Sequence, residues 1–511
     1  MQHTARLGSD EASSGGKLRR DLILGGILLA FLCVNMVFLL HHENWRDEAQ
    51  AWLLARDLSV PELIDQMSYE GHPCLWHLLL MPLAKLGLPY ASMNVLSLVI
   101  VAAAAALLLW KSPFPLPLKA MALFVCPLVY FYPVISRSYC LIALFGFMMA
   151  TFYQDRRERP LRYGLSIALM VQTHLIMLGM AAMASLVWLV EAICGYRRDR
   201  DRAVLLRQGA GLSLPLLSAV LFALQVRGAQ ASSAFTPDLS ALWRLPSNII
   251  STCLSIFRTM PRAIGMPLAI ISFAFVAFVV IYALWRREFA LFKPALIAAG
   301  AFVFQQAVHL VLRGSTAMRR LSLVIVALWA FWVAWPIVRD RLLRRLLALA
   351  MALVCVASYL PLRATPMQDL RMPYSNAKSC AEFIEATLPA DALILEVGEA
   401  YCSAVLPYLP ADRAFYSPYT GEEISYVTWN DAIYDQLAIG EYDQLCQWAT
   451  SMDADCDTVY LLVAKTSSDM FSAPMIEGFE PYLTQDALIY KSTERSVLPS
   501  EYFELYAIPV A

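Results

Sequence analysis

Long apolar runs separated by short polar stretches dominate the first two thirds of the chain. The first run, residues 22–40, has about the 20 residues that a membrane-spanning helix needs. Further runs lie at roughly 74–87, 91–110, 119–135, 138–154, 161–177, 179–195, 208–226, 266–285, 293–312, 321–338 and 346–362. This pattern predicts an α-helical polytopic membrane protein.

Basic residues cluster between alternate runs and predict which ends of the helices face the cytoplasm. The clusters are Lys17/Arg19/Arg20, Lys111/Lys119, Arg156/Arg157/Arg159, Arg197/Arg198/Arg200/Arg202/Arg207, Arg286/Arg287 and Arg339/Arg341/Arg344/Arg345. Placing them inside puts the N-terminus in the cytoplasm and leaves room for one crossing between Asp47 and Lys111. Run 74–87 is short and contains Pro82, so we expect it to form a short re-entrant or interfacial helix. About eleven full spans follow from this arrangement.

The sequence changes character after about Arg363, where acids, Tyr, Ser and Pro increase and long apolar runs end. Residues 377–388 have the apolar spacing of a helix, whereas 392–397, 458–463 and 487–490 are typical of strands. We therefore expect residues 363–511 to form an extracytoplasmic α/β domain. No Gly-rich phosphate-binding loop is present in it. Residues 1–20 are expected to form a cytoplasmic tail.

Composition supports the membrane assignment and excludes one class of partner. The chain of 511 residues is 59% hydrophobic and 16% charged, with a mean hydropathy of +0.55. Its formal net charge of −1 offers no electrostatic basis for binding nucleic acid. Four cysteines lie in the C-terminal part, namely Cys380, Cys402, Cys446 and Cys456. They permit disulfides, and Cys446 and Cys456 are the closest pair in sequence.

Two acids, Asp47 and Glu48, lie shortly after the first apolar run. A carboxylate at the membrane surface can act as a general base that takes the proton from an attacking hydroxyl or amine. Alternatively, the two acids stabilise the N-terminus of a surface helix through its dipole. Glu70 and His72 lie at the start of run 74–87, where His72 is a candidate for substrate binding or simply part of a helical turn that begins at Pro73.

Several arginines fall in predicted outer loops, where the positive-inside bias does not explain them. Arg137 lies in a tight turn beside Tyr139, and a loop over residues 313–320 contains Arg313, Arg319 and Arg320. The arginine fork fits phosphate oxygens, so an anionic lipid-borne ligand is one explanation. Snorkelling of Arg137, or contact of the loop with headgroups or the C-terminal domain, is the other.

His174 is predicted at the outer end of run 161–177, where an ionisable residue is a functional candidate or a partner for a neighbouring helix. The remaining histidines are scattered, and no His, Cys, Asp and Glu set has the spacing of a metal site.

These stretches together resemble the GT-C superfamily of integral-membrane glycosyltransferases, in particular protein O-mannosyltransferases and the bacterial transferases that add aminoarabinose to lipid A. Asp47-Glu48 is similar to the acidic motif of the first outer loop. His72-Pro73-Cys74-Leu75 resembles a His-Pro-Pro-Leu motif, with Cys at the second Pro. Ser136-Arg137-Ser138-Tyr139-Cys140-Leu141 resembles a motif whose arginine lies near the lipid phosphate, and Thr173-His174 matches a Thr-His motif. The likeness covers about residues 20–200.

The resemblance implies a catalytic membrane domain over residues 21–362, with a first outer loop at 41–73. It implies inverting transfer of a sugar from a polyprenyl-phosphate donor to a lipid, glycan or protein acceptor at the outer membrane face. Asp47 would be the base, with Glu48 beside it, and Arg137 with the arginines of 313–320 would hold the phosphate. Glu70, His72, Tyr139 and His174 would contact substrate.

Some relatives use a divalent cation and others do not, and no other cofactor is implied. Two alternatives stay open beside the transferase. One is a transporter or flippase of a lipid-linked sugar, and the other is a non-catalytic assembly protein that binds lipid phosphate.

Overall fold

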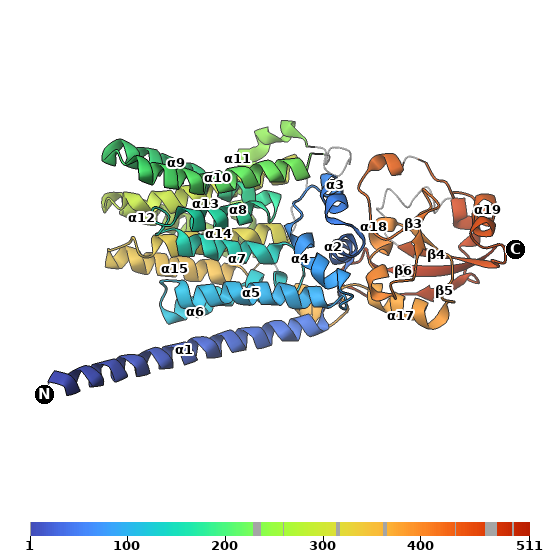
Figure 1. Cartoon of the computed structure of the whole chain (residues 1–511), viewed down its shortest axis with the longest axis horizontal. Coiled ribbons are helices and arrows are strands. Elements are labelled where there is room, and N and C mark those ends of the chain that lie inside the picture. The colour runs from blue at the N-terminus through green and yellow to red at the C-terminus, as the bar shows by residue number, and fades with distance from the viewer. Residues whose placement is uncertain are drawn as a thin grey trace.

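The computed structural model describes residues 2–227, 237–258, 260–312, 317–360, 365–434, 436–464, 478–492 and 495–510. A helical bundle occupies one end of the molecule and a β-sheet region the other, with α2, α3 and α4 between them (Figure 1). The helices before the sheet region are α1 (Gln2–His41), α2 (Arg46–Asp57), α3 (Val60–Glu70), α4 (Leu75–Lys85), α5 (Ser92–Lys111), α6 (Leu116–Leu123), α7 (Tyr139–Phe152), α8 (Pro160–Val171), α9 (Leu178–Asp199), α10 (Arg202–Gln225), α11 (Leu245–Arg258), α12 (Arg262–Trp285), α13 (Phe292–Val311), α14 (Ala317–Ala334) and α15 (Arg341–Ala357).

Six helical segments within the described residues are long and apolar enough to cross a membrane. They are Gly16–His41, Ser92–Lys111, Leu175–Asp199, Arg202–Gln225, Arg262–Trp285 and Phe289–Val311. Shorter apolar helices, α7 and α8, pack among them. The chain is therefore a multi-pass membrane protein, as its apolar runs predict. The count of about eleven spans stays a prediction.

The run at 74–87 forms the short helix α4, which packs against α2. The run at 119–135 is not one continuous helix, because α6 ends at Leu123 and a π-helical turn follows at Pro127–Phe131. Proline has no N–H to donate, which explains the break beside Pro127. The expectation of an outer loop through residue 320 is wrong, since α14 begins at Ala317 and carries Arg319 and Arg320 in its first turn.

In its described residues, the C-terminal region is built around a six-stranded mixed sheet of order β3-β2-β1-β4-β6-β5. Its elements are α16 (Thr365–Asp369), α17 (Ala377–Thr387), β1 (Ile394–Val397), α18 (Glu399–Cys402), β2 (Phe415–Tyr416), β3 (Glu423–Ile424), α19 (Tyr442–Met452), β4 (Thr458–Ala464), β5 (Leu488–Lys491) and β6 (Phe503–Pro509). Strand β1 is parallel to β2 and β4, whereas β6 is antiparallel to β4 and β5. The α/β fold class is confirmed, with α17, β1, β4 and β5 where the sequence predicts them.

The two ends of the molecule share a continuous hydrophobic core. One cluster of buried side chains extends from the bundle to α17 and to strands β1, β2, β4 and β6. Tyr408 packs its ring 5.1 Å from that of Tyr90 and donates from its hydroxyl to the Asn44 carbonyl at 3.1 Å. Cys446 and Cys456 both lie in described residues as unpaired thiols, so the possible bond between them is not present. Through this shared core the sheet region packs against the helical bundle.

Candidate active site

A cavity of about 450 Å³ lies where the bundle meets the sheet region. It is lined by Trp45, Arg46, Asp47, Gln50, Ala51, Glu70, His72, Pro73, Trp76, His77, Arg137, Ser138, Tyr139, Arg319, Ala400, Tyr401, Ser403, Val427 and Trp429. These residues come from α2, the end of α3, α4, the turn before α7, the first turn of α14 and the sheet region. The sequence-predicted Asp47, Glu70, His72, Arg137, Tyr139 and Arg319 are thus brought together.

Helix α2 presents Asp47 to the cavity and buries most of the rest of its length. Residues 48–55 are buried, and successive helical side chains point about 100° apart, so Asp47 and Gln50 share one face. Gln50 connects α2 to the sheet region by two hydrogen bonds. Its side-chain amide donates to the Val427 carbonyl at 2.8 Å and accepts from the Val427 N–H at 2.9 Å. The sheet region therefore helps to set the position of Asp47.

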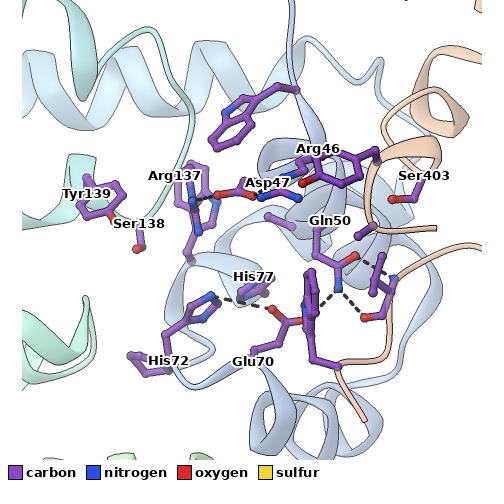
Figure 2. A pocket seen from close by; sticks show the side chains of 18 of the residues that line it. Arg46, Asp47, Gln50, Glu70, His72, His77, Arg137, Ser138, Tyr139 and Ser403 are labelled. Atoms are coloured by element: carbon purple, nitrogen blue, oxygen red, sulfur yellow. Dashed lines mark hydrogen bonds and ion pairs between the residues drawn. The ribbon is translucent and has the colours of Figure 1, made fainter. Parts of the chain in front are cut away.

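Asp47 lies between two arginines (Figure 2). One of its carboxylate oxygens accepts from Arg137 in an ion pair, and Arg46 Nε approaches the other to 3.5 Å. Burial opposes the charge of Arg137, but the nearby acidic groups, Asp47 foremost, together outweigh burial and raise the pKa of that guanidinium above its usual value. Asp47 is 26% exposed and Arg137 20%, so both remain open to a ligand in the cavity. A carboxylate and a guanidinium therefore face each other in the cavity.

Glu48 lies outside the cavity lining, although the sequence places it beside Asp47 as a catalytic candidate. Its carboxylate is fully buried, with Oε1 accepting from the Ser136 N–H at 2.5 Å. Oε2 contacts His42 Nε2 at 3.0 Å and accepts from the Trp45 N–H at 3.2 Å. Both oxygens are occupied, so Glu48 holds the start of α2 against the turn that carries Arg137.

His42 is buried between two carboxylates, with Nε2 3.0 Å from Glu48 and Nδ1 3.0 Å from Asp369 of α16. Its ring also packs 4.6 Å from that of Tyr374. Burial opposes protonation, but Glu48 and Asp369 outweigh it and raise the pKa of His42 from 6.5 to about 10. The positively charged His42, just after α1, therefore connects α2 with the segment that leads into the sheet region, through its contacts with Glu48 and Asp369.

This raised pKa predicts a pH-dependent stability. The stabilisation from charged His42 is complete below pH 6.5, the unfolded value, and is lost as pH rises through about 10. We expect the melting temperature in detergent to fall between these limits, and His42→Gln to show a shallower fall. Thermal unfolding of wild type and His42→Gln from pH 6.5 to 10 measures how the melting temperature changes with pH. An equal fall in both proteins would contradict this role of His42.

Glu70 and His72 form a second polar pair on the cavity wall. Glu70 accepts from Gln50 Nε2 at 2.7 Å, and His72 Nε2 is 3.9 Å from the other Glu70 oxygen. Burial raises the pKa of Glu70 to about 7. Burial, followed by repulsion from Arg137 and Arg319, lowers the pKa of His72 to about 3. Because the imidazole is then neutral near pH 7, the contact is polar rather than a full ion pair.

The other residues that the sequence predicts for the site differ in their distance from the cavity. Tyr139 lines the cavity, and its hydroxyl lies 3.3 Å from Nε2 of the buried His174 behind it. The Tyr139 and His174 rings stack with centroids 5.1 Å apart, so His174 supports the wall rather than lining it. Arg320 is exposed and is not part of the lining, and Arg313 lies outside the described residues.

Sequence reasoning missed several lining residues. Gln50 follows Asp47 by three positions, so helical spacing alone could have placed it on the same face. No comparable signal marks Tyr401, Ser403 and Trp429, which reach the cavity only because the sheet region packs on α2. Among the residues that the structure describes, no three or more His, Cys, Asp or Glu side chains are grouped to hold a metal ion.

Comparison with known proteins gives structural neighbours only. No protein-family model and no curated protein matches the chain. The crystal structure of ArnT from Cupriavidus metallidurans in the apo state covers 94% of this chain and 98% of its own, with 14% identity and a TM-score of 0.45. The structure of the same protein bound to undecaprenyl phosphate has the same coverage, 12% identity and a TM-score of 0.47. Because the identities and TM-scores are this low, the function of this chain has to be inferred from its own site.

Proposed function

We propose that this chain is an inverting glycosyltransferase that moves a sugar from a polyprenyl-phosphate donor to an acceptor at the outer membrane face. The observation that carries the proposal is the Asp47–Arg137 pair in a cavity at one end of a membrane-embedded bundle. A base and a phosphate-binding cation are the two groups that inverting transfer from a sugar phosphate requires.

Asp47 is the proposed general base. The acceptor oxygen or nitrogen forms a bond to the anomeric carbon while the bond from that carbon to the phosphate oxygen breaks. The bonding pair leaves with the phosphate, and Asp47 takes the acceptor proton. Arg137 and Arg319, both in the lining, stabilise the charge that grows on the phosphate. A phosphate at Arg137 also competes with Asp47 for the guanidinium and so frees the carboxylate to act.

The remaining residues have supporting roles in this proposal. Glu70, His72 and Tyr139 contact substrate from the cavity wall, and His174 orients Tyr139. We assign Glu48 to positioning, because both its oxygens are already bonded within the protein. Arg320 lies outside the lining and is given no part in phosphate binding.

The orientation in the membrane is also a proposal. The cavity is formed where α1 ends and where α7 and α14 begin. The N-terminus lies at the far end of α1, away from the sheet region (Figure 1). The basic clusters between α5 and α6, α7 and α8, and α9 and α10 belong to the opposite helix ends, which supports a cytoplasmic N-terminus and an outer sheet region.

Arg137→Gln is expected to weaken binding of a polyprenyl phosphate by roughly tenfold or more, because charge-assisted hydrogen bonds to the phosphate are lost. Undecaprenyl phosphate, the lipid in the second ArnT structure, is a suitable probe. Equilibrium binding of the radiolabelled lipid to the detergent-solubilised protein measures the change. Arg320→Gln is the matched control, and an equal effect of both substitutions would argue for non-specific attraction.

The class of activity is tested with the purified chain reconstituted in vesicles and a panel of radiolabelled polyprenyl-phosphate sugars. Transfer or hydrolysis of any donor supports the transferase, and an arm with chelator shows whether a divalent cation takes part. Movement of the lipid across the bilayer without turnover would instead support a transporter. Binding of lipid phosphate with neither turnover nor movement would support an assembly protein.

A further inference from the structure

Three polar side chains in the cavity lining are deeply buried and have a polar atom without a partner. Trp76 and His77 of α4 are 2% and 3% exposed, and Ser403, just after α18, is 2% exposed. Within the described residues, Trp76 Nε1, His77 Nδ1 and Ser403 Oγ have no hydrogen-bond partner. Buried polar groups are nearly always bonded, because leaving one unpaired costs the folded state stability. Their gathering in one cavity points to a ligand that completes them.

The chemistry of these atoms indicates what they bind. The indole N–H only donates, the serine hydroxyl donates and accepts, and an imidazole nitrogen does either. Alcohol groups and ring oxygens satisfy all three, whereas a charged group is better met by the Asp47, Arg46 and Arg137 side of the lining. The ring of Tyr401, over which Arg46 stacks at 4.3 Å, adds a flat aromatic face to the same cavity lining.

The position of Ser403 fits a ring attached to the phosphate. In Figure 2, Asp47 lies between Arg137 and Ser403, and the Ser403 hydroxyl is directed toward the Asp47 and Gln50 side. A sugar whose phosphate is held at Arg137 and whose far hydroxyls reach Ser403 passes Asp47. Its anomeric carbon is then close to the group that takes the acceptor proton.

We propose that Trp76, His77 and Ser403 form the donor-sugar subsite, which recognises the hydroxyl groups of an uncharged sugar ring. This inference rests on the proposed function. It assigns to α4 and the sheet region a share in donor specificity, while the phosphate is held separately by the arginines.

The test compares two lipids with each protein. Binding of undecaprenyl phosphate is measured beside binding of undecaprenyl-phosphate hexoses and pentoses, in wild type, Trp76→Phe and Ser403→Ala. Each substitution removes one polar atom and keeps most of the side chain. We expect each to weaken the best-bound sugar-bearing lipid by about fivefold, the equivalent of one neutral hydrogen bond. Binding of the bare phosphate lipid should stay unchanged.

Trp329→Phe is the matched control, because Trp329 is fully buried in α14, its Nε1 is also unpaired in the described part of the chain, and it does not line the cavity. Equal weakening of both lipids, or no weakening of the sugar-bearing one, would overturn the subsite. Either outcome would leave the proposed function standing, because wild type would still bind the lipids. If wild type bound neither lipid, the proposed function itself would fail, and the subsite with it.

Discussion

Asp47→Asn is expected to lower sugar turnover by at least about a hundredfold, the low end of what a general base contributes. The amide keeps the size of the carboxylate and can still accept from Arg137, so the cavity should keep its shape. It cannot take up the acceptor proton. Turnover of the radiolabelled donor in reconstituted vesicles measures the loss, with equilibrium binding of undecaprenyl phosphate as the second readout. Binding should persist, because the arginines are untouched.

Asp65→Asn is the control for this substitution, since Asp65 lies on α3, outside the cavity lining, and its side chain is 78% exposed. It should retain wild-type turnover. If Asp47→Asn also retained it, the base would have to be another lining carboxylate. Glu70 is then the group to test, because burial raises its pKa to about 7 and Glu48 is outside the cavity.

Glu48→Ala is expected to destabilise the protein by about 3–5 kcal/mol, the usual cost of breaking a buried charge pair. The substitution leaves His42 with one carboxylate and the Ser136 N–H without its acceptor. Thermal unfolding in detergent measures the loss. Glu48→Gln should recover part of it, because the amide oxygen can still accept from Ser136.

Glu385→Ala on the exposed face of α17 is the control and should change stability little. The activity of folded Glu48→Gln separates positioning from catalysis. Partial activity agrees with a residue that holds the turn before Arg137. A loss as large as that of Asp47→Asn in a protein of normal stability would return Glu48 to the catalytic set.

The sequence does not tell which of two adjacent residues of the same type faces the cavity. Asp47 and Glu48 have the same chemistry, and only the rotation of α2 decides that one faces the cavity and the other the Ser136 turn. Arg319 and Arg320 differ in the same way, because they lie in the first turn of α14 rather than in a loop. Successive side chains on a helix point about 100° apart. Which of two neighbouring residues faces the cavity therefore depends on how the helix is rotated in the fold, and neither composition nor a motif gives that rotation.

The sequence by itself determined the membrane-embedded helices, the later α/β region and the polar residues at one set of helix ends, because hydrophobic periodicity and charge bias are local properties of the chain. Only the tertiary structure decided which of those residues share a cavity. Tyr401, Ser403 and Val427 join Asp47 there because the sheet region packs against α2 and its core continues into the bundle. Contacts between residues more than 300 positions apart depend on how whole elements pack, and no local pattern contains that information.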